Sequence, residues 1–205
     1  MIKLDKLYNR PFDTITVDNF MPENEINKIK DNIYNVPEDK ASVGTDPSVD
    51  KWRVSRIKWL PFEEPFLSIY QNISHLIQDY NSDVWRFDLG AITNRLQYTE
   101  YHGDEKGKYN WHVDLGSRYN SYRKLSVSIQ LSDPSEYEGG DLQIFSPEID
   151  PNITEPSTDM FNFKTINKGI GSVAVFPSFI PHRVTPVTKG VRKSLVLWIG
   201  SKPFK

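Results

Sequence analysis

Apolar residues recur at helical spacing in two stretches of the first half of the chain. The first follows Pro22, a residue type that often opens a helix, and acidic residues occupy its first turn. This stretch predicts a helix over about residues 22–35, and the second predicts a helix over about 66–80 with its apolar side toward the core. The apolar positions that define the two helices are Ile26, Ile29, Ile33 and Tyr34, and then Leu67, Tyr70, Ile73, Leu76, Ile77 and Tyr80.

From Asp83 onward the pattern changes to short apolar stretches separated by turn residues, which is typical of β-strands. A strand is also expected over residues 12–17, and residues 51–59 should be extended. Segments 37–50 and 147–168 lack periodicity and are expected to be loops, the second a long surface loop. Many short strands indicate a β-sandwich or an open barrel. The strands expected after Asp83 cover residues 84–92, 94–101, 111–115, 123–131, 141–145, 172–176, 182–187 and 192–199.

Composition narrows the class of protein. The chain has 205 residues, of which 38% are hydrophobic and 25% charged, enough for one compact soluble domain with a sizeable core. The formal net charge of −2, without a long basic run, argues against a protein that coats duplex nucleic acid. Because the chain has no cysteine, disulfides and thiolate metal sites are excluded. The absence of cysteine is compatible with a reducing compartment. We find neither a secretory signal nor a run near ~20 apolar residues, so we expect a cytoplasmic protein without a membrane span.

A histidine and an aspartate two residues apart, His112 and Asp114, are the strongest candidates for chemistry. On a strand these side chains would point to the same face, because strand side chains alternate. His182 follows 70 positions after the first histidine. Two imidazoles and one carboxylate on one face form the 2-His-1-carboxylate facial triad, which suits non-haem Fe(II) and leaves coordination positions open. We therefore expect these three residues to bind a metal, and no further side chain to act as a general base.

Arg192 and Ser194 lie ten and twelve residues after His182, on one face of an expected strand. A guanidinium is a permanent cation whose planar fork matches a carboxylate, and the hydroxyl can donate another hydrogen bond. This pair can hold a dicarboxylate cosubstrate. Zinc could occupy the same three metal ligands, but a zinc hydrolase has no use for the Arg-x-Ser element.

The ordered set of motifs in the second half of the chain resembles the Fe(II)/2-oxoglutarate-dependent dioxygenases, and within them the prolyl-4-hydroxylase-like branch. A lone H-x-D is a weak signal, whereas the ordered set is a strong one. The matching residues are Leu96–Tyr101, Tyr109–Asp114, Arg123–Ser132, Gly139–Leu142, Val175–Ser178, His182, Val184, Pro186–Val187, Gly190, Arg192, Ser194–Leu195 and Trp198.

This resemblance implies a mainly β fold, a double-stranded β-helix (jelly roll) with N-terminal helices packed on one sheet. One domain would cover residues 1–205, with an α/β support over about 1–92 and a catalytic jelly-roll core over about 93–202. The cofactors implied are Fe(II), 2-oxoglutarate as cosubstrate and dioxygen, with ascorbate as a reductant. Arg192 would bind the distal carboxylate of 2-oxoglutarate, helped by Ser194.

The resemblance also suggests roles for further residues. Tyr101 would donate to the same carboxylate. Gln130 occupies a position where relatives often carry a tyrosine that faces the cosubstrate; an amide could still donate there. Trp198 and Tyr109 are candidates for the substrate pocket. Trp111 alternates away from His112 and would pack in the core.

The resemblance leaves more than one class of substrate open. A prolyl side chain of a peptide or protein is the expected target, and a free small molecule or another residue type is the alternative for the same chemistry. A nucleic-acid demethylase would typically carry a further arginine at position 198, where this chain has tryptophan, so no nucleic acid is expected. A non-catalytic jelly-roll binding module is the alternative from a different class. The oligomeric state is not indicated by the sequence.

Overall fold

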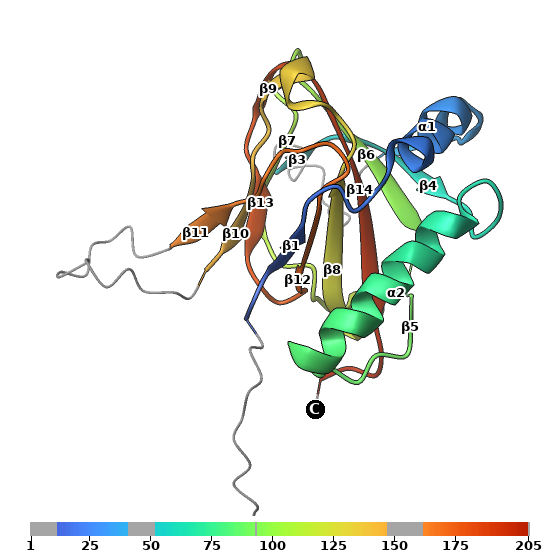
Figure 1. Ribbon diagram of the computed structural model, residues 1–205. Helices are drawn as coiled ribbons and strands as arrows, with labels where there is room; N and C mark the ends of the chain where they lie inside the picture. Colours follow the sequence, from blue (N-terminus) through green and yellow to red (C-terminus); the bar gives the residue numbers. More distant parts are fainter. Residues whose placement is uncertain (1–11, 41–51, 93, 147–161, 205) are drawn as a thin grey trace, which may run out of the picture.

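Two antiparallel sheets form the body of the protein in the computed structural model, and two helices pack on the larger sheet (Figure 1). The structure describes residues 12–40, 52–92, 94–146 and 162–204. None of the helices in this part of the chain combines the length and the apolar character needed to cross a membrane.

The larger sheet has the strand order β1 (Ile15–Val17), β12 (Val173–Pro177), β8 (Arg123–Gln130), β14 (Val187–Gly200), β6 (Leu96–His102), β4 (Arg56–Leu60) and β2 (Glu38–Lys40), and β5 (Ala91–Ile92) and β9 (Tyr137–Gly139) also pair with β14. The smaller sheet has the order β11 (Phe163–Thr165), β10 (Leu142–Phe145), β13 (His182–Val184), β7 (Lys108–His112) and β3 (Arg53–Val54). The helices are α1 (Glu23–Asn32) and α2 (Leu67–Asp83), with short 3-10 segments η1 (Ile33–Asn35), η3 (Arg118–Tyr122) and η4 (Pro134–Glu136).

This architecture confirms the predicted class, a mainly β jelly roll with helices on one sheet, and both helices lie where the periodicity indicated. Strands β1, β3 and β4, from the first 92 residues, pair with β12, β7 and β6, which lie within residues 93–202. The N-terminal part therefore contributes strands to both sheets as well as the two helices that pack on the larger one.

Several expected boundaries were wrong, among them both long loops and one strand. The expected loop 37–50 contributes β2, which pairs with β4 through backbone hydrogen bonds and so needs no apolar alternation; residues 41–50 lie outside the described residues. The expected loop 147–168 likewise ends in β11. The expected strand 84–92 is reduced to β5, because Arg86 has a φ of 54° and turns the chain before a strand can form.

Side chains along β14 alternate between the two faces of the larger sheet, and the two faces differ in character. Leu195 and Leu197 point into the core shared with the helices, whereas Arg192, Ser194 and Trp198 line a cavity between the sheets. The same division holds for β6 and β8, because period two places alternate residues on opposite sides. One face of the sheet is therefore apolar and carries the helices, and the other can carry polar chemistry.

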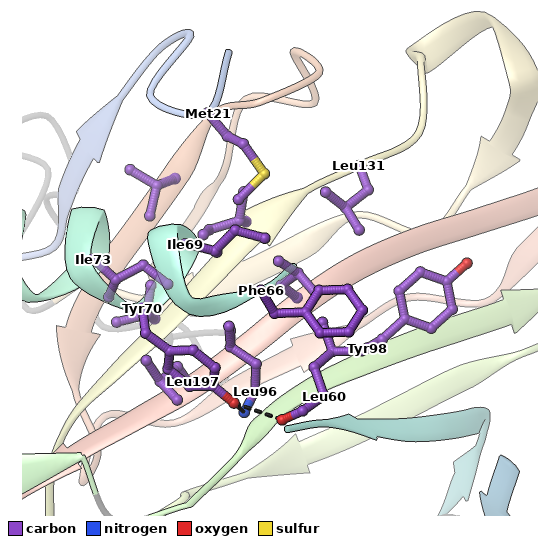
Figure 2. Packing of buried hydrophobic residues seen from close by; sticks show 14 of the residues in the cluster. Met21, Leu60, Phe66, Ile69, Tyr70, Ile73, Leu96, Tyr98, Leu131 and Leu197 are labelled. Atoms are coloured by element: carbon purple, nitrogen blue, oxygen red, sulfur yellow. Dashed lines mark hydrogen bonds between the residues drawn. The ribbon is translucent and has the colours of Figure 1, made fainter. Parts of the chain in front are cut away.

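A buried tyrosine ties α2 to the sheet. The Tyr70 hydroxyl donates to the carbonyl of Leu60 and accepts from the backbone N–H of Leu96, both at 2.6 Å (Figure 2). Phe66, Ile69 and other residues of the helix pack beside it on the same face (Figure 2). Because Leu60 and Leu96 are cross-strand partners at the ends of β4 and β6, one side chain satisfies a buried backbone group of each.

We predict that Tyr70→Phe lowers the free energy of unfolding by about 1–3 kcal/mol, because a buried N–H and a buried C=O lose their partner while the apolar packing is kept. Denaturant unfolding followed by circular dichroism measures the change. Tyr119→Phe is the matched control, since Tyr119 is 85% exposed and should leave stability unchanged. Equal stability of the two variants would contradict the anchoring role.

Candidate active site

The three predicted metal ligands are brought together at the end of the smaller sheet. His112 is the last residue of β7, His182 is the first of β13, and the two are direct cross-strand partners. Asp114 lies beyond β7, so it does not share a strand with His112 as expected. Its position is instead set by a turn in which the backbone N–H groups of Asp114 and Leu115 both donate to the Ser178 carbonyl, at 2.9 and 2.8 Å.

The geometry of these side chains suits one small cation. One ligand atom from each of His112, Asp114 and His182 lies within 4.8 Å of the others. The Nε2 atom of His112 is 3.6 Å from Oδ1 of Asp114, and Nε2 of His182 is 3.4 Å from Oδ2. Two nitrogens and one oxygen on one side of a common point are the donor set of the facial triad, so the residues fit Fe(II).

Backbone carbonyls fix the orientation of both imidazoles. Nδ1 of His112 is 2.7 Å from the Asn110 carbonyl, and Nδ1 of His182 is 3.0 Å from the Ile180 carbonyl. A carbonyl only accepts, so each Nδ1 must carry the proton and each Nε2 lone pair is left for a metal. Burial lowers the pKa of His112 to about 3, and His182 acts in the same direction, which keeps the His112 imidazole neutral as a metal ligand requires.

The Asp114 carboxylate is held by hydroxyl groups behind it. Ser126 donates to Oδ2 at 2.7 Å, and its oxygen lies 2.9 Å from the Ser178 hydroxyl. Burial alone would raise the pKa of Asp114, but the neighbouring His182 and His112 and the hydrogen bonds it accepts hold that pKa well below its usual range. The carboxyl group is thus ionised and oriented, as metal binding requires.

A cavity of about 350 Å³ lies in front of the three ligands, between the sheets. Its wall includes every predicted site residue except Gln130. The predicted residues that line it are Tyr101, Tyr109, His112, Asp114, His182, Arg192, Ser194 and Trp198.

Arg192 supplies a buried positive charge to this cavity. It is 4% exposed, and its Nη1 donates to the Ser194 hydroxyl over 3.4 Å. The guanidinium carbon lies 5.6 Å from the centre of the Tyr101 ring. Within the described ranges no carboxylate forms an ion pair with Arg192. A buried cation without an acidic partner calls for an anion, and a dicarboxylate cosubstrate fits it.

The Gly139–Gly140 turn makes room for Arg192. Both glycines have positive φ, 74° and 62°, and a Cβ added to Gly140 would lie 3.0 Å from Cδ of Arg192 and 2.8 Å from Cγ2 of Val187. Any larger residue would therefore displace the arginine stem or strain the turn.

Gln130 is not among the residues that line the cavity, and its contact with the cosubstrate stays a prediction. Its Nε2 donates to the Tyr137 hydroxyl at 2.9 Å and to the Ser132 carbonyl at 3.2 Å. Burial raises the pKa of Tyr137, and the neighbouring Arg192 guanidinium acts in the opposite direction. Gln130 is the last residue of β8, and Tyr137 opens β9, which pairs with β14 opposite Gly190. Gln130 is thus linked to a tyrosine beside Arg192.

Aromatic rings flank the metal ligands. Tyr109 stacks on His112 with ring centres 3.4 Å apart, and burial raises the pKa of Tyr109 to about 12, so its hydroxyl keeps its proton. Trp198 lies 6.4 Å from Trp59, centre to centre. Trp111 is not in the core as expected; it is half-buried on the outer face of the smaller sheet, because no helix covers that face in the described part of the chain.

Sequence reasoning missed several residues of this site. Arg53, Trp59 and Gln97 line the cavity but come from strands outside or at the edge of the quoted motifs. Ser126 and Tyr137 lie behind the lining. A signal existed for Ser126, because Ser126 and Ser128 alternate with apolar residues in an otherwise apolar strand, which marks a polar inner face.

Residues 96–200, just over half of the chain, match the family described as the 2OG-Fe(II) oxygenase superfamily. The chain therefore belongs to this superfamily, and the resemblance inferred from the sequence is confirmed. Fe(II) and 2-oxoglutarate, the cofactor and cosubstrate expected from the sequence, are those that give the family its name.

Curated relatives agree with this assignment. A PKHD-type hydroxylase of Acidovorax ebreus (strain TPSY) is 33% identical over 46% of this chain and 39% of its own. One from Xanthomonas campestris pv. campestris (strain 8004) is 28% identical over 69% of this chain and 59% of its own. The chain thus spans about 40–60% of the length of these relatives.

Solved structures show the same fold. A Pseudomonas putida prolyl-4-hydroxylase superposes with a TM-score of 0.70 at 18% identity, covering 93% of this chain and 94% of that one. A Trichoplax adhaerens prolyl hydroxylase, in complex with a hypoxia inducible factor oxygen degradation domain peptide fragment, gives 0.70 at 18% identity, covering 91% and 83%. At this identity the likeness concerns the fold.

We predict a graded loss of metal affinity along the hydrogen-bond chain. Asp114→Ala removes a ligand and should abolish tight Fe(II) binding, whereas Ser126→Ala leaves the ligand and removes only the bond that orients it, which should weaken binding about 10–100-fold. Anaerobic titration measures both. Ser128→Ala is the control, because Ser128 lies on the same face of β8 without a hydrogen bond to Asp114; a loss as large as that of Ser126→Ala would sink the orienting role.

Proposed function

We propose that the protein is an Fe(II)- and 2-oxoglutarate-dependent dioxygenase that hydroxylates an unactivated C–H bond, and that its target is a prolyl side chain of a peptide or protein. The observation that carries the proposal is the presence of a facial triad and a buried, carboxylate-free guanidinium in one cavity. The metal set alone would suit several reactions. The buried guanidinium of Arg192, a site for an anion next to the metal ligands, restricts the reaction to one that consumes a dicarboxylate.

His112, Asp114 and His182 would hold Fe(II), and Arg192 with Ser194 would hold the distal carboxylate of 2-oxoglutarate, with Tyr101 beside them. The bound iron supplies oxidation: dioxygen and 2-oxoglutarate are consumed, succinate and carbon dioxide leave, and one oxygen atom enters the substrate C–H bond. The supported pair Gln130–Tyr137 would keep the guanidinium in place. No described side chain needs to move a proton in this scheme.

The walls of the cavity would exclude water and position the substrate. Tyr109, stacked on His112, and Trp198 form apolar surfaces close to the metal ligands. A cavity bounded by such aromatic side chains suits a pyrrolidine ring, which is apolar and compact. The PKHD-type and prolyl hydroxylase relatives support a prolyl target, although the chain is shorter than the curated ones. Ascorbate as reductant, the cytoplasmic location and the single-domain organisation remain predictions.

The substrate is tested with iron-loaded protein, 2-oxoglutarate and ascorbate, incubated with a library of proline-containing peptides. We expect mass spectrometry to locate a gain of one oxygen on proline. The control is a matched library with alanine in place of proline. Succinate release without any peptide product, together with oxidation of a free metabolite, would retain the oxygenase and reject the peptide substrate.

We predict that Arg192→Ala weakens 2-oxoglutarate binding at least about a hundredfold, because removing one partner of a desolvated charged pair costs ~3–5 kcal/mol. Arg192→Lys should recover part of the loss, since the charge stays and the planar fork is lost. Calorimetry with the anaerobic Fe(II) protein measures both. Lys193→Ala is the control, because Lys193 faces the opposite side of β14; wild-type affinity in Arg192→Ala would show that another cavity arginine binds the carboxylate.

A further inference from the structure

Two more arginines line the cavity, and neither has an acidic partner among the residues that the structure describes. Arg53 comes from β3 and Arg123 from the start of β8. Within the described residues neither forms an ion pair with a carboxylate. Arg56, three residues after Arg53 and exposed, shows the contrast, because it pairs with Glu105. Arg53 and Arg123 thus differ from Arg56 in that no carboxylate of the described residues balances their positive charge.

Arg53 is held in place by its neighbours. Its Nε donates to the Ser55 hydroxyl at 2.9 Å and its Nη2 donates to Oε1 of Gln97 at 2.7 Å. The guanidinium carbon lies 4.8 Å from the centre of the Tyr109 ring, which in turn stacks on His112. Nη1 has no acceptor among the described residues. The stack thus holds the Arg53 guanidinium next to the metal ligand His112, and Nη1 of Arg53 is left to donate to a ligand.

Arg123 is fixed in a similar way. Its guanidinium carbon lies 3.7 Å from the centre of the Trp198 ring, and its Nε is buried without a hydrogen-bond partner in the described part of the chain. Nη1 makes only a long contact, 3.4 Å, to the Asp114 carbonyl. A buried donor without a partner is costly, so this group calls for an acceptor from a ligand.

The charges in the cavity leave a surplus once the cofactors are counted. Fe(II), the Asp114 carboxylate, doubly charged 2-oxoglutarate and Arg192 together sum to zero. Arg53 and Arg123 then remain, against one acidic lining residue, Asp39, which is exposed. Two guanidiniums stacked on aromatic rings are already ordered, so a carboxylate would bind them with little loss of side-chain entropy.

We propose that the substrate carries a carboxylate that Arg53 and Arg123 bind, and that this carboxylate belongs to an acidic residue a few positions from the target proline. This inference rests on the proposed function and adds its substrate class, an acidic peptide. Tyr109 and Trp198, which form the walls of the cavity, orient the two guanidiniums by stacking. The rings therefore hold in place the cations that set the preference for an anion.

Binding, measured without turnover, provides the test. Fluorescently labelled peptides with one central proline carry Asp at each of the three positions on either side in turn, and each is paired with its Asn isostere. Their affinities are measured by polarisation with the anaerobic Fe(II)–2-oxoglutarate protein. We expect at least one Asp peptide to bind about tenfold or more tightly than its Asn partner. Amidated and free C-termini, and free proline as competitor, distinguish a side-chain carboxylate from a terminal one.

Variants identify the cations responsible. Arg53→Gln and Arg123→Gln should each remove most of the Asp preference, whereas Arg53→Lys and Arg123→Lys should retain part of it because the charge remains. Arg56→Gln is the matched control and should keep the full preference. Arg53→Glu and Arg123→Glu should shift the preference toward Lys-containing peptides, a result that misfolding would not produce.

The outcomes separate this inference from the proposed function. Equal binding of all Asp and Asn pairs, or a preference that survives both Gln substitutions, overturns the acidic substrate even if the protein hydroxylates proline. A preference confined to free C-termini or free proline also overturns it. An Asp preference lost in both Gln variants supports the acidic substrate, and if the same protein releases no succinate, it is the hydroxylase function that fails.

Discussion

Strand β14 serves both faces of the larger sheet, and the site depends on this division. Its odd-numbered residues Leu195 and Leu197 are fully buried under the helices, which fixes the strand's register. A slip by one residue would turn Arg192 and Ser194 out of the cavity and into the helical core, where a guanidinium would have no partner. The apolar packing against α1 and α2 therefore specifies where the positive charge of the cavity lies.

The metal ligands depend on a different constraint, the satisfaction of buried backbone groups. The Ser178 carbonyl accepts from two successive N–H groups, and the carbonyls two residues before His112 and His182 each accept from an imidazole. These bonds set both the direction of Asp114 and the tautomers of the histidines. Main-chain atoms thus preorganise the three ligands, and the Ser126 hydroxyl completes the orientation of the Asp114 carboxylate.

The sequence predicted the parts of the site that depend on local spacing. Strand alternation along β14 gave the face shared by Arg192, Ser194 and Trp198, and helical periodicity gave both helices. It failed where long-range pairing decides. Asp114 is positioned by Ser178, 64 residues away, and not by strand alternation as assumed. Gln130 was assigned to the cosubstrate from the resemblance alone, and its hydrogen bond to Tyr137 of β9 leaves no trace in local pattern.

The residues on the substrate side illustrate the same limit and also its reason. Arg53 comes from a two-residue strand, too short to show periodicity, and meets Gln97 and Tyr109 only through sheet pairing. The cosubstrate side is built from long strands of the larger sheet, whereas the substrate side combines the short strand β3 with Arg123, the first residue of β8. Long strands constrain their side chains strongly. Short ones can exchange side chains at little cost to the core, so substrate preference can change while the metal and cosubstrate sites stay intact. Arg53, stacked on Tyr109, fits this arrangement, because the ring holds the cation in place without a long strand beneath it.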